Sequence, residues 1–509
     1  MGPFRPGDYL YSYAVMGLPA IFLTSALFFA LATVTRSMMA TYVGVVGVFI
    51  AYMVASGVLG SKPELEQIMA WAEPFGSAAF SLVTKYWTPA ERNVLNVPLS
   101  GVFLGNRLLW TGVGLAVLAA TYWLYQPTAR GAKAGAVDKL KTLSAAPAQT
   151  APTAPLAKPS YGLKAGWTQL WARTRFEMAL VFKSPAYVVL MLMGLAFAIT
   201  ILMVSGEIYG TPVYLVTRVV ITALQGSFGL VSMIVAIYYS GELIWRDRDR
   251  KVHELIDATA TPDWTFLLPK TLALVLVLAS ILIVGMIAGI GMQISRGMFD
   301  FEIGKYLMWY VLPGTLGFGM IAVLAIVVQS LSPNKFVGWA IMVVYLISTI
   351  ILGTMGFDHV LYRYGADISV PLSDMNGRGD FWKYALWTQA YWTAGAVLLL
   401  VLAYGLWRRG TETRFMPRIR RLPRRLKGAA GAVGAVALAA FVGLGVFIFI
   451  NTNVWNEYRT DRQSEQLRAN YEKTLLRYEK TPQPSITDVK LDLDLHPRDS
   501  RLETRGAYV

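Results

Sequence analysis

The stretch GELIWRDRDRKVHELIDATATPDW, residues 241–264, separates two long apolar runs, and this alternation decides the fold class. It holds ten Asp, Glu, Arg and Lys side chains, whereas the runs 219–240 and 271–294 hold none. A helix needs about 20 apolar residues to cross the hydrocarbon core of a bilayer. We therefore predict that both runs cross a membrane and that the charged stretch lies in the aqueous phase between them.

The composition of the whole chain agrees with a membrane protein. Of its 509 residues, 55% are hydrophobic and 15% are charged, whereas soluble domains carry about 25% charge. Cysteine is absent, which excludes disulfides and Cys-ligated metals, and the three His residues lie far apart in sequence. The net charge of +15 fits Lys and Arg in cytoplasmic loops better than it fits nucleic-acid binding, so we expect no nucleic-acid partner.

Hydropathy and loop charge together predict an all-α polytopic membrane protein with about ten transmembrane helices. A short C-terminal extramembrane helix and the start of a β-hairpin follow them. Lys and Arg gather in 126–184 and 408–428, which places both segments on the cytoplasmic side of the membrane. Alternation puts 241–265 on the same side and the C-terminal segment outside. The predicted spans are 11–34, 37–60, 108–125, 185–206, 219–240, 271–294, 306–329, 336–356, 385–407 and 429–450.

An internal repeat organises most of these spans. The stretch LPAIFLTSALFF from Leu18 aligns with LPGTLGFGMIAV from Leu312 at an offset of 294. Each begins a span, a short polar turn and a second span, followed by an external segment and one more span. Spans one to three therefore correspond to spans seven to nine, the alternative being chance similarity between apolar helices. Equivalent copies would leave the first without its first three spans, so we expect this chain to be a piece of a longer protein.

The second copy opens with GWTQLWARTRFEMALVFKSP, which begins at Gly166. Its apolar and basic side chains are spaced as in an amphipathic helix that lies in the membrane interface before a span begins. The residues assigned to this interfacial helix are Trp167, Trp171, Arg173, Arg175, Phe176, Glu177 and Lys183.

The order of elements in this copy carries a resemblance. An interfacial segment precedes six spans, a mixed-charge loop follows the second span, and the tight turn QSLSPNK joins the fourth and fifth. This arrangement resembles the membrane subunit of ABC exporters of the type-2 permease class. In that family the loop after the second span is a coupling helix that docks on a separate ATPase subunit. The resemblance implies this role for Glu242, Arg246, Asp247, Arg248, Arg250, Lys251, Glu254, Leu255, Thr261 and Pro262.

The same resemblance implies the partners and the cofactor. An ABC ATPase subunit would bind ATP, the lipid bilayer would surround the spans, and a second permease copy is a further expected partner. The chain itself has no G-x-x-x-x-G-K-[ST] loop for ATP. His253-Glu254-Leu255-Ile256-Asp257 resembles a zinc motif, but Asp257 replaces the second His. We therefore expect no catalytic residue, metal ligand or cofactor in this chain, and no enzymatic activity.

The C-terminal segment differs in character from the repeats. A polar, helical stalk ends near Pro482, and Val489, Leu491, Leu493 and Leu495 then alternate with polar residues as in a half-buried strand. This part is similar to the start of the amino-terminal β domain of aminopeptidase N-like zinc peptidases. The resemblance implies a zinc site beyond Val509, so zinc is expected only if a peptidase domain follows.

These features divide the chain into segments and leave three functions open. The leading hypothesis is the permease of an ATP-driven exporter, and the alternative is a membrane-anchored zinc metallopeptidase. A secondary carrier is disfavoured because the spans as drawn hold no ionisable residue. The segments are 1–126 (second half of the first repeat, with external segment 61–106), 127–165 (disordered cytoplasmic linker), 166–407 (second repeat), 408–428 (basic cytoplasmic loop), 429–451 (tenth span), 452–485 (external stalk) and 486–509 (start of a β domain).

Overall fold

Most of the predicted spans are helices in the computed structural model of the chain. Within the described residues, nine helices are long and apolar enough to cross a membrane, which confirms a multi-pass helical membrane architecture. Most of the predicted span 37–60 and of the linker 127–165 lies outside the described residues. The structure describes 5–36, 63–125, 162–204, 214–259, 261–366, 381–410, 415–482, 485–496 and 501–509, with isolated residues between these stretches.

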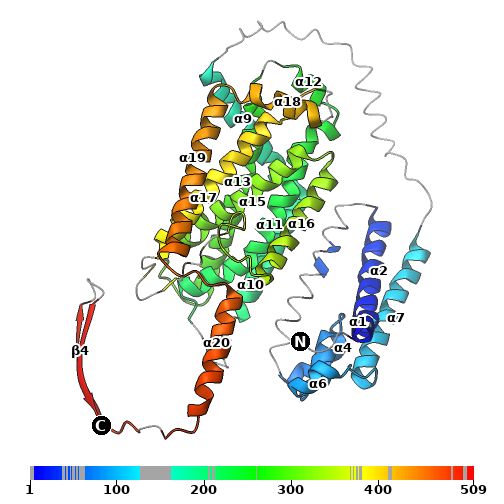
Figure 1. Ribbon diagram of the computed structural model, residues 1–509. Coiled ribbons are helices and arrows are strands. Elements are labelled where there is room, and N and C mark those ends of the chain that lie inside the picture. The colour runs from blue at the N-terminus through cyan, green and yellow to red at the C-terminus, as the bar shows by residue number, and fades with distance from the viewer. Residues whose placement is uncertain are drawn as a thin grey trace. The chain divides into compact units, whose positions relative to one another are not determined.

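The N-terminal part, 5–125, is a helical pair with a helical connection (Figure 1). Its first apolar rod runs from Pro6 to Thr35 and packs along α7. Gly114 of α7 lies against the Phe22 ring, where a Cβ atom would be 2.7 Å from that ring, so the small residue permits the close approach. The elements are α1 (Pro6–Ser12), η1 (Tyr13–Gly17), α2 (Leu18–Thr35), η2 (Pro63–Leu65), α4 (Glu66–Ala72), α5 (Ser77–Val83), α6 (Pro89–Val94) and α7 (Gly101–Leu124).

The larger part, 162–448 without 348–363, is a helical bundle built around α11, α13 and α15. Helix α11 buries Val220, Leu224, Phe228, Val231 and Val235, a spacing of three to four residues that keeps one face against the neighbouring helices. Its elements are α9 (Leu163–Phe182), α10 (Pro185–Val204), β1 (Glu207–Ile208), β2 (Thr211–Pro212), α11 (Thr217–Asp249), α12 (His253–Asp257), α13 (Trp264–Ser295), α14 (Ile303–Tyr306), η3 (Leu307–Val311), α15 (Leu312–Leu331), α16 (Lys335–Thr354), α17 (Phe381–Gly405), α18 (Phe415–Arg425) and α19 (Ala429–Phe449).

Two of these helices extend well beyond the apolar runs that predicted them. Helix α11 continues to Asp249 and α13 begins at Trp264, so only 250–263 is a separate connection. Arg and Glu are good helix formers, so the charged residues after Ser240 prolong α11 into the aqueous phase. The break comes at Lys251, whose φ of 57° is left-handed and turns the chain into α12. The first part of the charged stretch therefore prolongs α11, and the second part forms the connection to α13.

The two sequence copies share an uncommon backbone feature. A five-residue π-helix, η1 (Tyr13–Gly17), precedes Leu18, and another, η3 (Leu307–Val311), precedes Leu312. The offset between them is 294, the same as in the sequence alignment. A proline two positions into a helix removes one N–H and crowds the carbonyl four residues earlier, which the wider π turn accommodates. Pro19 and Pro313 occupy that position in both copies.

The C-terminal segment, together with 348–363, forms a second compact unit. Its α20 begins with a capping box between Thr460 and Gln463. Strands β3 and β4 pair antiparallel, from Val489 opposite Tyr508 to Leu495 opposite Leu502. The burial expected for one face of β3 is not found, since its leucines are 53–66% exposed. The elements are η4 (Ile450–Val454), α20 (Asp461–Leu475), η5 (Leu476–Tyr478), β3 (Val489–His496) and β4 (Arg501–Tyr508).

Candidate functional site

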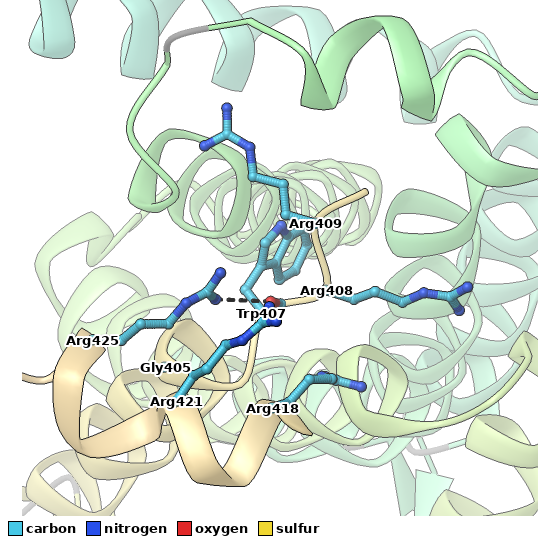
Figure 2. Close-up of a pocket in the computed structure, with 7 residues that line it drawn as sticks. All are labelled: Gly405, Trp407, Arg408, Arg409, Arg418, Arg421 and Arg425. Atoms are coloured by element: carbon cyan, nitrogen blue, oxygen red, sulfur yellow. Dashed lines mark hydrogen bonds between the residues drawn. The ribbon is translucent and has the colours of Figure 1, made fainter. Parts of the chain in front are cut away.

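The residues assigned to coupling gather at one end of the 162–448 bundle. Helices α9, α11, α12 and α13 meet there, together with the basic segment that joins α17 to α19. Figure 2 shows α18 of that segment crossing beside the turn Trp407–Arg409. Two groups of polar contacts hold this end together, one buried among the helices and one around the connection 250–263.

The buried group is a four-residue ion-pair network. Glu177 of α9 accepts from Arg246 at 2.9 Å and from Lys270 at 3.1 Å. Lys270 of α13 also donates to Asp247 at 3.2 Å and to the Leu243 carbonyl at 2.6 Å. Two acids thus face two bases, and Glu177 and Lys270 are only 5% and 3% exposed. Removing one partner of a buried ion pair strongly destabilises the folded state. The network therefore favours the one packing of α9, α11 and α13 in which all four side chains meet.

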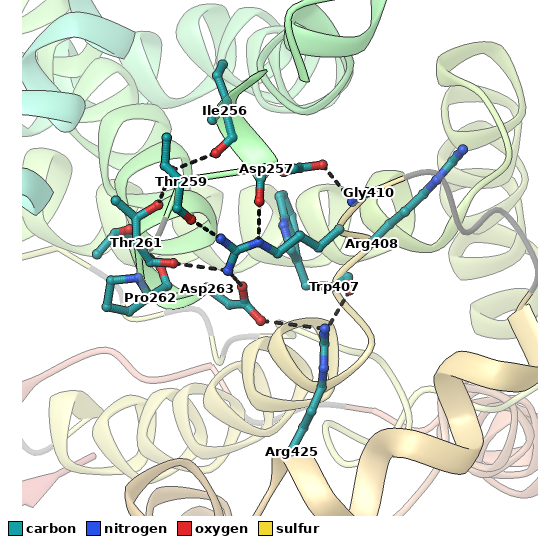
Figure 3. A network of polar contacts seen from close by, with 12 residues as sticks. Ile256, Asp257, Thr259, Thr261, Pro262, Asp263, Trp407, Arg408, Gly410 and Arg425 are labelled. Atoms are coloured by element: carbon teal, nitrogen blue, oxygen red, sulfur yellow. Dashed lines mark hydrogen bonds and ion pairs between the residues drawn. The ribbon is translucent and has the colours of Figure 1, made fainter. Parts of the chain in front are cut away.

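The second group lies around the connection from Asp257 to Asp263 (Figure 3). Arg409, which follows α17, makes most of its contacts. Its guanidinium donates to the carbonyls of Asp257, Thr259 and Thr261, at 2.9 Å for Asp257 and 3.1 Å for Thr261. It also pairs with the Asp263 carboxylate at 2.8 Å. Arg409 therefore donates hydrogen bonds to three backbone carbonyls, one at the end of α12 and two in the irregular residues that follow it. Its single side chain sets the position of α12 relative to the bundle.

Further contacts attach the end of α11 to its neighbours. Lys335 of α16 pairs with Glu242 at 3.1 Å and with Asp249 at 3.0 Å. Arg248 donates to the Arg408 carbonyl at 3.1 Å. Glu242, Arg246, Asp247 and Arg248 are thus engaged within the chain, and Thr261 is half-buried beside Arg409. This half of the predicted coupling set builds the frame of the site.

The other half of the coupling set faces outward. Leu255 of α12 is 76% exposed. Arg250, Lys251, Glu254 and Pro262 are exposed around it. The result is a surface, termed here the α12 surface, in which Leu255 lies among charged residues of both signs. Such a composition suits contact with a protein better than contact with an anionic lipid surface.

The predicted interfacial helix corresponds to α9, and its residues divide between two surroundings. Trp167, Trp171 and Phe176 are 54–65% exposed, as expected of side chains that face lipid. Arg175 and Lys183 are also exposed. Arg173 turns inward, donating to the Thr265 carbonyl at 3.3 Å and lying 4.3 Å from the Phe266 ring centre. Burial lowers the pKa of Arg173, with Asp247 and Glu177 opposing that effect.

Glu177 and Arg409 are the residues whose roles the sequence alone did not reveal. Glu177 was assigned to the interface, yet it lies at the centre of the buried network. A carboxylate on the apolar side of an amphipathic helix was a usable signal, because such a charge is buried only when it is paired. Arg409 was taken as one of many topogenic charges, and nothing local distinguishes it from Arg408.

A cavity of about 830 Å³ adjoins the π-helix η3. Trp309 and Tyr310 of η3 line it, together with Arg218, Gln225 and Gln389. A smaller cavity of about 430 Å³ adjoins η1 in the N-terminal part, lined by Val15 and Met16 among others. These residues are the counterparts of Trp309 and Tyr310 at the offset of 294. Apolar walls with a few convergent polar groups are typical of small-molecule sites.

Neither a metal site among the described residues nor a match to a known protein identifies the function of this site. Among the residues that the structure describes, no group of three His, Cys, Asp or Glu is placed to hold a metal ion. No family model matches the chain, no curated protein matches it, and no solved structure matches it.

Proposed function

We propose that this chain is the membrane-spanning permease of an ATP-driven exporter of the inner membrane. In this proposal a separate ABC ATPase subunit docks on the α12 surface from the cytoplasm, and the C-terminal segment lies outside. The observation that carries the proposal is the α12 surface itself. Arg409 holds the end of α12 and the residues that follow it, while Leu255 and the charged residues near it in sequence remain exposed.

The contacts behind α12 suit the transfer of force. A displacement of α12 acts on Arg409 and Asp263, and through them on α13 and the end of α17. The ion-pair network then links α13 to α9 and α11. Interfaces of this kind have discrete packed arrangements and do not deform continuously, so a movement at one end can reorient whole helices. The cavity beside η3 is the proposed contact surface for the exported molecule.

Co-purification of the ATPase tests the proposal. The change is Leu255→Asp with Lys251→Glu in the natural-length protein, expressed with its genomic neighbours and purified by a tag. We expect recovery of the ATPase subunit to fall at least tenfold, because central apolar contacts dominate interface energies. Leu476→Asp in η5, where the leucine is 66% exposed, is the matched control and should leave recovery unchanged. Equal ATPase recovery with both variants would sink the coupling proposal.

A second candidate function, a membrane-anchored zinc peptidase, is favoured by one observation. The apolar face of β3 is exposed along its length, although a two-stranded hairpin is marginally stable in water. That face is suited to packing against further strands, as in the amino-terminal β domain of such peptidases. The protein isolated at its natural length should then contain about one zinc ion per chain by metal analysis. Zinc-free protein with intact folding would exclude this function.

A further inference from the structure

The segment between α17 and α19 encloses a small cavity lined almost entirely by arginine. Because both flanking helices are candidate spans, the segment lies at a face of the membrane whichever way the chain is oriented. Helix α18 runs along one side of the cavity and the turn after α17 along the other (Figure 2). The lining residues are Gly405, Trp407, Arg408, Arg409, Arg418, Arg421 and Arg425.

Three of these arginines have partners within the chain and form the frame of the cavity. Arg409 holds the connection to α13, as described above. Arg418 donates its Nε to the Leu406 carbonyl at 2.8 Å and a terminal nitrogen to the Ser330 carbonyl at 3.3 Å. Arg425 donates to the Trp407 carbonyl at 2.9 Å. Helix α18 is therefore fixed on the bundle, and the walls of the cavity are in place before any ligand arrives.

The other two arginines have donors left over. The Nε of Arg408 is buried and has no hydrogen-bond partner among the described residues. Arg421 is exposed at the cavity and makes no hydrogen bond or ion pair within the described part of the chain. A guanidinium carries five N–H donors, and a buried donor without an acceptor costs about 1–3 kcal/mol. An acceptor with several oxygens could bond the Arg421 guanidinium and the terminal nitrogens of Arg408.

The charges around the cavity favour an anion. Its five arginines are faced by two carboxylates of the described residues, Asp257 and Asp263, which already bond Gly410 and Arg409. Burial lowers the pKa of Arg418, and the nearby Arg408 and Arg425 lower it further. Burial also lowers the pKa of Arg408, with Asp257 opposing. Like charges held this close destabilise one another until an anion enters.

We propose that this arginine cavity binds a phosphate ester, with Arg408 and Arg421 donating to it and Arg418 and Arg425 supporting them. Phosphate is the group whose spread of oxygens best matches the planar fork of a guanidinium. The ester can be the headgroup of an anionic phospholipid in the adjoining leaflet, or a soluble phosphate compound. Arg409 lies beside the cavity, so its contacts would respond to binding of the ester. They would thereby respond to the anionic phospholipid in the leaflet or to the soluble phosphate compound.

A matched pair of double variants tests this site. Arg408→Gln with Arg421→Gln removes the proposed donors. Arg420→Gln with Arg424→Gln removes the same charge from exposed positions of α18 that do not line the cavity. The probes are dihexanoyl phosphatidylglycerol and inorganic phosphate, each titrated into the detergent-purified chain with melting temperature as the readout. We expect saturable stabilisation by at least one probe, weakened at least tenfold in the first variant and unchanged in the second.

The outcomes with the two probes distinguish a lipid headgroup from a general phosphate ligand. A third variant controls for misfolding. Stabilisation by the lipid alone would assign a headgroup site, and stabilisation by both probes would assign a general phosphate site. Arg408→Lys with Arg421→Lys keeps the charge without the fork and should bind with intermediate affinity, which also shows that the chain folds. Equal weakening by both glutamine pairs, or no stabilisation by either probe, would overturn the proposal.

Discussion

Single side chains decide how the end of the bundle near α12 is built. Lys270 contacts Glu177, Asp247 and the Leu243 carbonyl at once, although it is 3% exposed on a helix that is otherwise apolar. Arg409 does the same for the connection between α12 and α13. At this end of the bundle, charged side chains mainly hold the helices to one another, while Leu255 and its exposed neighbours form the proposed docking surface.

Replacing Lys270 by Met should destabilise the fold strongly. The change leaves Glu177 and Asp247 with Arg246 as their remaining ion-pair partner among the described residues, so the buried carboxylates are less well compensated. Losing one partner of a buried pair costs about 3–5 kcal/mol. Thermal unfolding in detergent measures the effect. Lys251→Met, at an exposed position, should change the melting temperature little, and equal shifts for the two variants would contradict the network's role.

At the scale of elements, small residues set how closely helices cross. Gly241 of α11 and Gly338 of α16 both approach Gln329 of α15. The Gln329 amide is buried, accepts from the Trp245 indole at 3.1 Å and donates to the Lys335 carbonyl at 3.3 Å. Three helices therefore share one amide, and close approach of their backbones is what permits it.

Gly338→Ala should loosen this crossing. Its Cβ atom would lie 2.4 Å from the Gln329 side chain, which is bonded at both ends and cannot move without losing a contact. Overpacking of this kind costs about 1–3 kcal/mol in thermal or denaturant unfolding. Gly353→Ala in the same helix meets open space and should be neutral or slightly stabilising. A melting temperature that is lowered equally by both changes would refute the close crossing.

The contact between 358–363 and the start of the stalk should depend on pH. His359 is 4% exposed, with its Nε2 3.1 Å from the Thr452 hydroxyl and its ring 4.5 Å from that of Tyr458. Burial lowers the pKa of His359, although the neighbouring Asp358 opposes the shift. The unfolded histidine, with a pKa of about 6.5, therefore takes up a proton before the folded one does.

The stability that this contact supplies is thus present above pH 6.5 or so and is lost as pH falls below that value. Hydrogen exchange of 450–461 should be faster at pH 5.5 than at pH 7.5, after correction for the intrinsic rate. Asp358 holds the Tyr458 hydroxyl at 2.8 Å and the Asp461 N–H at 2.7 Å, so part of the protection should persist. His359→Gln should remove the pH dependence, and an unchanged dependence in that variant would assign it to another group.

At the scale of the whole molecule, the distribution of Lys and Arg predicts the orientation of the chain. In the sequence, the basic segment 408–428 precedes the candidate span Ala429–Val454 and α20 follows it. Lys and Arg concentrate on the cytoplasmic side of membrane proteins. The α12 surface and the arginine cavity share one end of the bundle, so both proposals place their ligands on one side of the membrane.

Cysteine labelling can test the orientation directly, because the chain has no Cys of its own. An impermeant maleimide should label Lys473→Cys in intact cells, whereas Arg420→Cys should react only after permeabilisation. Both positions are exposed, so accessibility and not burial decides the result. The reverse pattern would place α12 outside and end the ATPase proposal. Labelling of both from one side would show that Ala429–Val454 does not cross.

The sequence by itself determined the multi-pass helical membrane architecture, and it suggested the repeat. Apolar character summed over about 20 residues is a strong local signal, and the 294-residue offset reappears in the two π-helices because the same Leu-Pro pair follows each. Only the tertiary structure decided where the charges act. Glu177, Lys270 and Arg409 lie far from their partners along the chain, and whether a charge is paired inside or exposed outside depends on which helices meet. The coupling stretch was therefore visible in the sequence as one block, while its division into an internal frame and the α12 surface required the packed bundle.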